Sequence, residues 1–495
     1  MLAVDRFSVK TLCYSVEDGR IAFSDRADSV PLERSRELDP QALFEYLYFH
    51  VIPAPRTVFQ GVERLRAGHT LELADGRRRV IRHWRPIFEE RHRQPLEELK
   101  REFRSLVEDA VRREAAGRRV GCFLSGGTDS STVAGMLGRV TGRPPATFSI
   151  GFDAEGYDEM GYARIAARHF GTEHHEHYIT PADLVEGIPR VATWYDQPFG
   201  NSSAVPVLVC ATLAREAGLD KLLAGDGGDE LFGGNARYAT QRLLEAYSCV
   251  PGPVRGGLIE PVLLGVRPLG QIPLARKAAG YVRQARLRMP QRLNAYNLLL
   301  RLGVEEVLAP DFLRSIDQEE PDRAQRAVWD EAGGVAFINR MLAYDWKYTL
   351  ADNDLPKVCG TAALAGIEVG FPLLAHELVD FSLRLEPELK LKRLKLRYFF
   401  KEALRGFLPD EVIGKKKHGF GLPFGVWLAS HAGLRALAHA SLASLDGRGI
   451  VKPGFLESLL TKRLPEHPAY YGEMVWVLLV LEQWLAARAP RFAVK

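Results

Sequence analysis

The amino-acid sequence predicts an α/β protein built on a doubly wound parallel sheet, with a helical C-terminal region and a small β-rich N-terminal section. Two observations carry this prediction. Between residues 119 and 224, short apolar runs alternate with longer amphipathic stretches, which is typical of parallel strands joined by crossover helices. Two of these runs end in glycine-rich turns that lead into helices, and doubly wound sheets bind their ligands at such turns.

The predicted elements follow the chain in order. Residues 1–90 read as short strands and turns, with hairpins over 11–24 and 67–76 and a helix over 43–50. Residues 95–117 carry apolar side chains at spacings of three and four, which predicts a helix. Strands and helices then alternate, at 119–124, 129–141, 146–152, 158–170, 174–179, 181–194, 204–217 and 221–224. After residue 236 the strand signals fade, and a helical bundle packed on the sheet is expected.

Composition narrows the class of protein. A chain of 495 residues with 46% hydrophobic and 26% charged residues is typical of a globular enzyme of two or three domains. A net charge of +4 gives no case for nucleic acid or membrane surfaces as partners. Five scattered cysteines, with no CxxC pair, indicate reduced thiols and no zinc site. No signal peptide opens the sequence, so a cytoplasmic protein is expected.

The first glycine-rich turn carries the motif SGGTDSS at residues 125–131. A strand, a small-residue turn and a helix together aim backbone N–H groups at an anion, and Gly126 and Gly127 let a phosphate approach closely. The remaining polar side chains offer hydroxyl donors and a carboxylate for magnesium: Ser125, Ser130, Ser131 and Asp129. No lysine completes a GxxxxGK[ST] loop, so this is a different phosphate cradle. The plain alternative is a Ser/Gly turn ahead of an ordinary helix.

The second turn carries the motif GDGGDELFGG at residues 225–234. Its three acids, Asp226, Asp229 and Glu230, would repel one another unless a cation or a phosphate–magnesium group joined them. An acidic helix N-terminus would account for Asp229 and Glu230, but not for Asp226 and the glycine pair. The sequence therefore favours a metal–pyrophosphate site.

These two motifs resemble those of a known family. SGGTDSS resembles the pyrophosphate-binding loop of the ATP pyrophosphatases, which cleave ATP to AMP and pyrophosphate to adenylate a substrate. Together with GDGGDELFGG, it resembles the synthetase domain of the asparagine synthetase family, which includes β-lactam synthetases and lasso-peptide cyclases. The resemblance runs from about residue 95 to 490 and implies an adenine nucleotide α-hydrolase-like fold. Three further segments take part in it: 151–159, 201–206 and 415–423.

The resemblance implies roles for individual residues. ATP and Mg²⁺ are the implied cofactors, and the implied pyrophosphate ligands are Ser125, Gly126, Gly127, Asp129, Ser130 and Ser131. Leu124, Ile150 and Gly225 would line the adenosine pocket, and Asp129 and Asp229 would bind the metal. Asp226 stands at a position implicated in deprotonating the incoming amine. Lys417, in the late basic segment, would stabilise charge in the transition state, although it also reads as one of three solvated lysines.

Residues 1–90 resemble the second half of the family's glutaminase domain, through the run VDRFSVKTLCY at 4–14. In full-length members a nucleophilic cysteine follows the initial methionine, whereas Leu2 follows Met1 here and the nearest cysteine is Cys13. The expected organisation is a partial class II glutaminase-like β domain over 1–90, lacking that nucleophile, and a synthetase domain over 91–495 with its α/β core ending near 240. Either a natural truncation or a late start would explain this. Glutamine hydrolysis by the chain is not expected.

A second departure lies in the late substrate-side segment. Cys359 and Gly360 stand where the family usually has Asp-Arg, while Gly370 and Ala375 replace a usual Arg and Asp. Loss of charged groups in a buried segment changes which carboxylate can be bound, although Glu368 remains.

The sequence thus predicts an ATP-dependent amide-forming ligase that passes through an acyl-adenylate, with aspartate as the default substrate. The alternatives are another carboxylate, as in polysaccharide or peptide biosynthesis, and a non-catalytic nucleotide-binding scaffold. The expected partners are a small-molecule carboxylate and ammonia or an amine donor. A glutaminase partner and a homodimer are left open.

Overall fold

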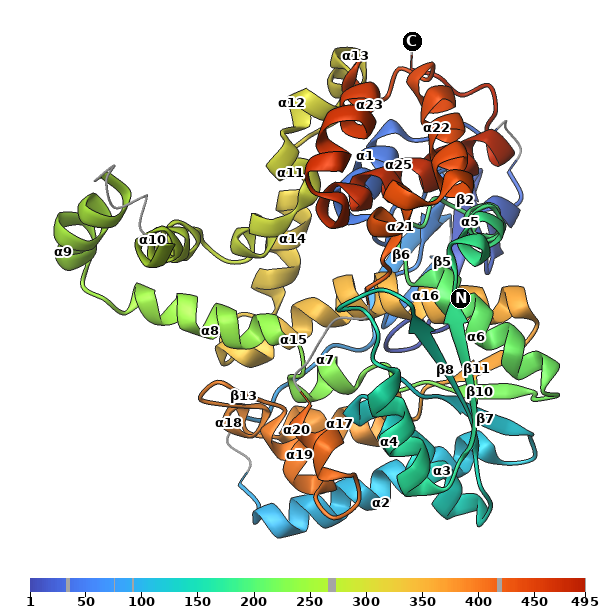
Figure 1. The fold of residues 1–495 in the computed structure, drawn as a ribbon, viewed down its shortest axis with the longest axis vertical. Coiled ribbons are helices and arrows are strands. Elements are labelled where there is room, and N and C mark those ends of the chain that lie inside the picture. The colour runs from blue at the N-terminus through green and yellow to red at the C-terminus, as the bar shows by residue number, and fades with distance from the viewer. Residues whose placement is uncertain (33–35, 75, 91–92, 266–272, 416–420, 495) are drawn as a thin grey trace.

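The computed structural model describes residues 1–495 apart from 33–35, 75, 91–92, 266–272, 416–420 and 495. Its centre is a five-stranded parallel sheet in the order β11-β10-β7-β8-β9 (Figure 1). The strands are β7 (Val120–Phe123), β8 (Ala146–Phe152), β9 (Glu173–Ile179), β10 (Lys221–Leu223) and β11 (Glu368–Gly370). The doubly wound parallel sheet predicted from the sequence is confirmed.

The edge strand β11 was not predicted. Its three residues, Glu-Val-Gly, pair in parallel with β10, from Lys221↔Glu368 to Leu223↔Gly370. A run this short carries no periodicity, so a sequence pattern cannot separate it from a loop. The sheet therefore takes one strand from well beyond residue 240.

Helices cover both faces of the sheet. One face packs against α2 (Leu96–Ala115), α3 (Thr128–Thr141) and α4 (Met160–Phe170), and the other against α6 (Ala204–Glu216) and α16 (Leu355–Ala365). The alternation of a strand explains this division, because Leu223 belongs to the first core and its neighbour Leu222 to the second. Both leucines are fully buried.

The sheet reverses its winding between β7 and β10. From β7 the chain continues to β8 and β9 on one side, and it returns to β10 on the other, with Cys122 opposite Leu223. The loops after these two strands therefore leave the same edge of the sheet side by side. Crevices at such switch points are where open α/β sheets bind ligands. Both predicted phosphate loops lie here.

The N-terminal section forms two small antiparallel sheets. One contains β1 (Leu2–Ala3), β5 (His69–Ala74) and β6 (Arg77–Arg82), and the other contains β2 (Cys13–Glu17), β3 (Arg20–Ser24) and β4 (Glu63–Arg64). The two predicted hairpins correspond to β2–β3 and β5–β6. The predicted first helix is α1 (Pro40–Phe49), which Asp39 caps by accepting a hydrogen bond from the Gln41 N–H.

The C-terminal bundle comprises α21 (Phe424–Ser430), α22 (Ala432–Asp446) and α25 (Pro468–Arg488), at the top of Figure 1. It packs on α1 and on α5 (Pro181–Trp194), and it reaches the sheet only at strand ends such as Phe152 and Ile179. Buried tryptophans fix it in place: the Trp484 Nε1 donates to the Tyr195 carbonyl at 3.1 Å, and the Trp476 Nε1 to the Gly200 carbonyl at 2.9 Å. These three helices thus rest mainly on other helices, whereas α16, also beyond residue 236, packs on the sheet as predicted.

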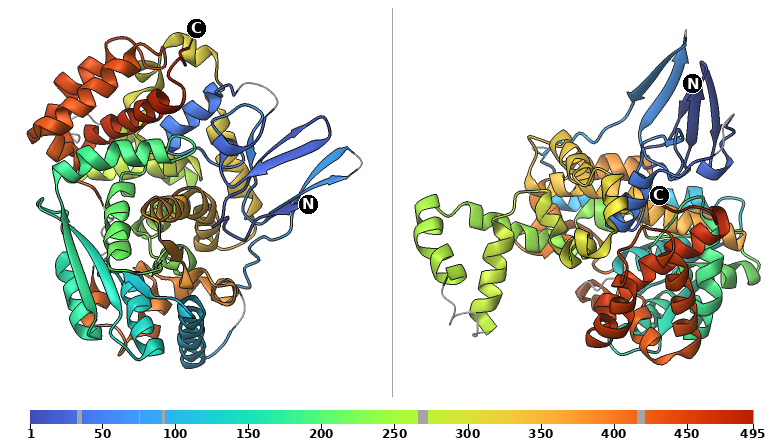
Figure 2. Two further views of the ribbon diagram at one scale, coloured as in Figure 1. Left: turned by 90° about the vertical axis from the view of Figure 1, so that its right-hand side faces the viewer. Right: turned by 90° about the horizontal axis from the view of Figure 1, so that it is seen from above.

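An arm of helices stands out from this body (Figures 1 and 2). It contains α8 (Ala236–Ser248), α9 (Gly252–Val254), η2 (Arg255–Ile259), η3 (Pro261–Gly265) and α10 (Pro273–Ala285). The arm has a small core of its own, which includes Leu244, Tyr247 and Val282. None of the helices among the described residues is both long and apolar enough to cross a membrane.

The remaining elements connect the arm, the sheet and the bundle. They are η1 (Ala27–Ser29), α7 (Gly228–Phe232), η5 (Gln291–Tyr296), α11 (Leu298–Leu302), α12 (Val304–Val307), α13 (Pro310–Arg314), α14 (Glu320–Glu331), α15 (Phe337–Asp345), η6 (Trp346–Asp354), η7 (Pro372–Leu374), α17 (His376–Arg384), α18 (Pro387–Lys390), β12 (Leu391–Lys392), β13 (Lys395–Leu396), α19 (Tyr398–Leu404), α20 (Asp410–Gly414), α23 (Phe455–Ser458), η8 (Leu459–Arg463) and α24 (Leu464–Glu466).

An aromatic cluster joins three of these elements behind the phosphate loops. The Phe103 ring of α2 lies 5.3 Å from that of Phe232 in α7, and 5.6 and 5.4 Å from those of Phe399 and Phe400 in α19. Phe103 is fully buried. Its ring therefore sets the spacing of α7 and α19, which both contribute to the site described below.

Substitution of Phe103 tests this packing. We expect Phe103→Ala to lower the free energy of unfolding by about 3–5 kcal/mol, because it leaves a cavity among three rings. The exposed control Leu300→Ala should change it by less than about 0.5 kcal/mol. Denaturant unfolding followed by fluorescence measures both, and equal losses in the two variants would contradict the assignment.

Candidate functional site

The first phosphate loop is folded by its own serines. The Ser125 N–H donates to the Ser130 Oγ at 3.1 Å, and the two hydroxyl oxygens lie 3.0 Å apart. Gly126 has a φ of +66°, and a Cβ there would overlap the backbone of Tyr162 and Ala163. Only glycine therefore lets the loop turn so close to α4.

The loop ends at the N-terminus of α3, where Gly127 is the N-cap. The first N–H groups of this fourteen-residue helix have no intrahelical acceptors, and they lie beside the loop. The Ser131 Oγ is buried and has no hydrogen-bond partner among the described residues. Free amide hydrogens and an orphaned hydroxyl at a helix N-terminus fit a phosphate group.

The second loop lies directly against the first. A Cβ on Gly225 would come within 2.7 Å of the Ser130 amide nitrogen and 2.9 Å of the Asp129 Cβ. Such contacts are closer than any real side chain makes, so glycine at this position lets the two loops touch. The short helix α7 then begins at Gly228 and carries Asp229 and Glu230 in its first turn.

Arg397 joins the two loops. Its Nη1 lies 2.6 Å from the Asp129 Oδ2 and 2.9 Å from the Asp229 Oδ1, and its Nη2 donates to the Asp129 Oδ1. Nη1 also donates to the Thr128 Oγ1 at 2.8 Å. The two acids that the sequence assigned to a metal are therefore close together, within reach of the same guanidinium nitrogen.

The backbone and surroundings of Arg397 hold it in this position. It precedes α19 with a left-handed φ of 55°, and its N–H donates to the Gly233 carbonyl at 3.1 Å. Its guanidinium carbon lies 4.1 Å from the centre of the Phe400 ring. Burial alone would lower the pKa of Arg397, but Asp129 and Asp229 outweigh it and raise this pKa above its usual value. The guanidinium is therefore a permanent cation in the site.

No sequence pattern marks Arg397, because it stands in an Arg- and Lys-rich region with no motif around it. Only the folded chain brings it to the two loops.

The pair Asp129 and Asp229 has the chemistry of a magnesium site. Two carboxylates and substrate phosphate oxygens are the usual ligands of Mg²⁺, which rarely takes an all-protein cage. No cluster of three or more His, Cys, Asp or Glu suited to a metal occurs in the described part of the chain.

Asp226 lies next to a buried lysine. Burial raises the pKa of Asp226 to about 6, and Lys357 acts against this shift. The Lys357 Nζ lies 2.8 Å from the Asp354 Oδ1. Burial alone would lower the pKa of Lys357, but Asp354 and Asp226 together raise it. Asp226 is thus poised to exchange a proton near neutral pH, beside a lysine that stays charged.

The segment between the loops supports this cluster. The Asn201 Nδ2 donates to the Asn353 Oδ1 at 2.9 Å, one residue before Asp354. Glu230 is also buried, and burial and then Asp229 raise its pKa well above the usual value. Burial therefore dominates the pKa of Asp226 and of Glu230, whereas Asp129 and Asp229 are paired with a guanidinium.

The late basic segment also reaches the first loop. The Lys415 Nζ lies 3.5 Å from the Ser125 carbonyl oxygen and 3.1 Å from the Glu159 Oε2, and 4.6 Å from the centre of the Tyr162 ring. Lys417, which the resemblance assigned to transition-state charge, lies outside the described residues. Lys415 was not singled out from the sequence, although its place in the same basic run was visible.

The expected adenosine residues lie at the same edge of the sheet. Leu124 continues β7, with its N–H donating to the Phe148 carbonyl at 2.8 Å, and its side chain is buried. The Ser149 Oγ donates to the Leu124 carbonyl. Ile150 is partly exposed in β8, and Gly225 contacts Ser130 as described. All three therefore lie at or near the carboxyl ends of β7, β8 and β10.

The departures from the family pattern are packed into the fold. A Cβ on Gly360 would come within 2.7 Å of the Tyr195 hydroxyl, and one on Gly370 within 2.8 Å of the Lys221 Cε. Larger residues do not fit at either position without rearrangement. Glu368 does not compensate for them, because it stands at the start of β11, at the edge of the sheet opposite the loops, and its Oε1 lies 3.3 Å from the Arg118 Nη1.

A separate cavity of about 950 Å³ lies between the N-terminal section and α14, α15 and η6. Arg64, Arg66, Trp84 and Lys347 contribute to its lining. Its wall also includes Trp346, whose Nε1 donates to the Glu230 carbonyl at 2.8 Å. One wall residue of the cavity thus contacts the second loop, whereas no residue of either loop lines the cavity.

This fold and site define an α/β protein with paired phosphate-type loops at the switch point of its sheet. The chain belongs to the asparagine synthase family, whose model matches residues 102–486, and a glutamine amidotransferase domain model matches residues 1–84. The family is one of ATP-dependent carbon–nitrogen ligases.

Three relatives illustrate the similarity. "Asparagine synthetase [glutamine-hydrolyzing] 1" of Bacillus subtilis is 24% identical over 86% of this chain and 66% of the relative. A putative asparagine synthetase of Mycobacterium tuberculosis is 28% identical over 98% of this chain and 74% of its own. A second putative enzyme of this name, from Methanocaldococcus jannaschii, is 33% identical over 46% of each chain. This chain thus spans about two thirds of the Bacillus relative.

Removal of the guanidinium tests the junction between the loops. We expect Arg397→Met to lower the thermal unfolding midpoint, since breaking a buried ion pair costs about 3–5 kcal/mol. Added Mg²⁺ should restore much of the loss by binding the two freed acids in the folded state only.

Arg448→Met is the matched control for this prediction, because Arg448 is also buried and its Nη2 donates to the Glu482 Oε1 at 2.9 Å. Its midpoint should fall without recovery in Mg²⁺. Equal responses of the two variants to Mg²⁺ would show that the acids at the loops are not a divalent-ion site.

Proposed function

We propose that this chain is an ATP-dependent amide-forming ligase that adenylates a carboxylate, with aspartate as the default substrate, and then joins ammonia or an amine to it. One observation supports this above all: the two glycine-bearing loops meet at the switch point of the sheet, with Asp129 and Asp229 on the same guanidinium. That arrangement suits a triphosphate tail and a divalent ion.

In the first half-reaction the substrate carboxylate attacks the α-phosphorus of ATP, which forms an acyl-adenylate and releases pyrophosphate. The amide hydrogens at the start of α3 and the hydroxyls of Ser125, Ser130 and Ser131 hold the pyrophosphate. Charge develops on its bridging oxygen as the bond breaks, and preorganised donors stabilise that charge. Lys415 lies beside this loop, and Lys417 follows it in the same basic run.

Asp129 and Asp229 would hold Mg²⁺, which neutralises phosphate charge and polarises the bond that breaks. Arg397 keeps the two carboxylates close together and partly neutralises their negative charge. The neighbouring glycines leave the space that these side chains occupy, so the arginine, the two acids and the glycines together form the metal site.

In the second half-reaction an amine attacks the activated carbonyl, and the amide forms as AMP leaves. The attacking nitrogen must lose a proton. Asp226 can accept it, because burial raises its pKa to about 6. Lys357 remains charged beside it and stabilises the carboxylate form.

A different carboxylate within the same chemistry is the second candidate. The observation that favours it is the packing of Gly360 against the Tyr195 ring and of Gly370 against the ends of the Glu114 and Lys221 side chains, so that the charged residues usual in the family would require these neighbours to move. Acids from polysaccharide or peptide biosynthesis belong to this class. A non-catalytic scaffold accounts less well for the site, since a scaffold needs neither the paired acids nor the orphaned Ser131 hydroxyl.

A pyrophosphate-release assay across candidate carboxylates, with ATP, Mg²⁺ and ammonia, separates these readings. Release with aspartate supports the default, and release only with another acid supports the second candidate. If no acid among a broad panel elicits release, the ligase proposal fails and the scaffold is favoured.

A substitution at the proposed metal site gives a sharper prediction. Asp129→Asn should reduce pyrophosphate release by about 10²-fold or more, because it removes a charged ligand while keeping the shape of the side chain. Asp311→Asn, at an exposed position in α13, should leave the rate unchanged. Circular dichroism should show both variants folded, and substantial release by Asp129→Asn would remove its role.

The pH dependence tests Asp226. Amide formation, measured at a fixed concentration of unprotonated ammonia, should fall as the pH drops through about 6, because protonation of Asp226 removes the base. Asp226→Asn should lower the rate by about 10²–10⁴-fold and abolish this limb, while pyrophosphate exchange continues. An unchanged acid limb in that variant would assign the proton to another group.

A further inference from the structure

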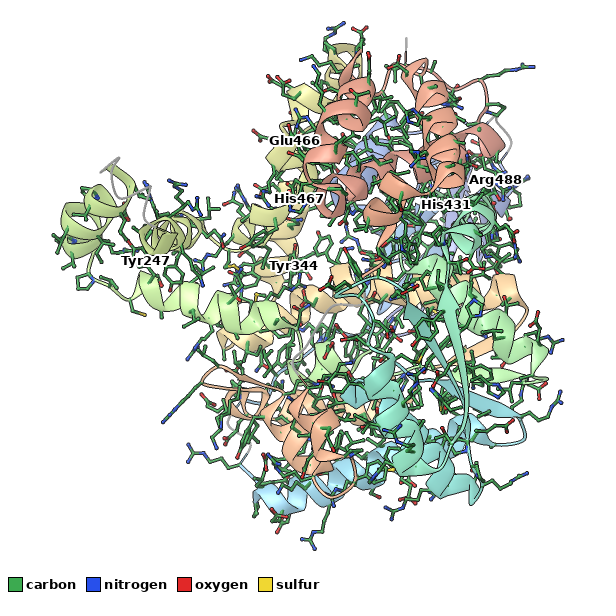
Figure 3. All side chains as sticks on the ribbon, viewed as in Figure 1. Tyr247, Tyr344, His431, Glu466, His467 and Arg488 are labelled. Carbon is green, nitrogen blue, oxygen red and sulfur yellow. The ribbon has the colours of Figure 1, made fainter. Side chains whose placement is uncertain are left out.

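The arm, taken together with the returning segment that ends with η5 at Tyr296, spans residues 236–265 and 273–296 and contributes no residue to the chemistry above. It leaves the body directly after the second phosphate loop, since Gly234 ends that loop and α8 begins at Ala236 (Figures 1 and 2). Tyr247, labelled in Figure 3, lies within its small core, where the Tyr247 and Tyr281 ring centres are 6.3 Å apart. The arm thus packs one face on its own small core, and its other face is turned toward the surroundings.

The outer face of the arm is apolar. Val254, Leu258 and Val262 follow one another at a spacing of four along the helical run from α9 through η3, so they share a face. They are 42%, 62% and 43% exposed, respectively. Ile259 and Leu263, each one residue beyond Leu258 and Val262 in the same run, pack on the core of the arm. The run therefore has one apolar side that is covered and a neighbouring apolar side that is exposed.

Other exposed apolar side chains gather on the same arm. Six of the sixteen large apolar residues that are exposed in the described part of the chain lie there: Leu243, Val254, Leu258, Val262, Leu287 and Tyr296. The arm is only about one eighth of the sequence, so this is an excess. Concentrated exposed apolar surface marks a site of interaction.

The arm is also strongly basic. Residues 236–296 contain ten Lys and Arg and two Glu, a net charge of +8, whereas the whole chain is +4 and the remainder is therefore −4. Acidic partners engage Arg286 and Arg292, through Glu260 and Glu245. Within the described residues none engages four other cations of the arm: Arg276, Lys277, Arg283 and Arg288. The small total charge of the chain hid this asymmetry.

We propose that the arm docks on the surface of a bilayer that contains anionic lipids. The stripe of Val254, Leu258 and Val262 enters the interface between head groups and acyl chains, and the free cations of α10 meet the negative head groups. Neither component suffices alone, because few apolar side chains bind weakly and exposed cations are screened by salt. The membrane is touched from one side only, since none of the described helices is suited to span it.

The apolar stripe distinguishes this partner from nucleic acid. A polyanion would engage the arginines and leave Leu258, the most exposed of the three, in water. Docking in this way holds the phosphate loops at a fixed height above the lipid, because α8 is continuous with the second loop. The proposal stands on the arm alone and does not depend on the ligase assignment.

Co-sedimentation of the full chain with vesicles tests it. We expect binding to vesicles of phosphatidylcholine with one third phosphatidylglycerol, weaker binding as salt is raised, and at least about tenfold weaker binding to phosphatidylcholine alone. The variant Val254→Ser/Leu258→Ser/Val262→Ser and the variant Arg276→Glu/Lys277→Glu/Arg283→Glu should each lose about tenfold or more in binding.

The matched control is Val80→Ser/Ile81→Ser/Ile87→Ser, which removes side chains that are 43%, 38% and 63% exposed elsewhere on the surface. It should bind as the parent does. Thermal unfolding midpoints check that each variant is folded, and size-exclusion chromatography reports self-association.

Three results would overturn the proposal. The first is absence of binding to the anionic vesicles at low salt. The second is equally tight binding to duplex DNA that does not change in the apolar variant, which would make the arm a polyanion site. The third is a change of oligomeric state in the apolar variant with no change in vesicle binding, which would assign the stripe to a second copy of this chain.

Discussion

The structure of the site depends on one guanidinium shared by two carboxylates. Arg397 reaches Asp129 from the first loop and Asp229 from the second, and all three side chains are largely withdrawn from water. Without a cation between them, two like charges at this distance would repel the loops from each other. The glycines follow from the same constraint, because a Cβ on Gly228 would overlap the Asp129 carboxylate and one on Gly234 the Asp229 carboxylate. The glycines of the second motif thus stand at the positions where a side chain would collide with one of the two carboxylates.

The two loops could be predicted because their signal is local: a strand, a small-residue turn and a helix follow one another within a dozen residues. The role of Arg397 could not be predicted, because it stands 268 residues after Asp129 and no neighbouring sequence pattern indicates which residues it contacts. The edge strand β11 was missed for a related reason, since three residues have no period. Glu368 was expected to remain on the substrate side, but the parallel register places it at the opposite edge of the sheet, beside Arg118. Register is a property of the folded sheet and not of the residue.

The total charge of the chain concealed the basic character of the arm. This total is the sum of a basic arm and an acidic remainder, and its small value describes neither part. Similarly, the residues that depart from the family pattern at 360 and 370 look like simple losses of charge in the sequence. In the fold they are close contacts with Tyr195 and Lys221, so neighbouring side chains have taken the space. Such replacements alter the shape of a substrate pocket as well as its charge.

The position of Arg397 also sets the order in which the site can form during synthesis. Domains fold as the chain leaves the ribosome, from the N-terminus onward. The four strands β7 to β10 and both acidic loops emerge well before β11 and before the arginine that neutralises them. For the time needed to translate those intervening residues, the nascent sheet lacks an edge and its two acids lack their shared counter-charge. The junction between the two loops is therefore one of the last parts of the protein to mature, and a ribosome that stalls before residue 397 leaves a chain with both loops and no arginine to join them.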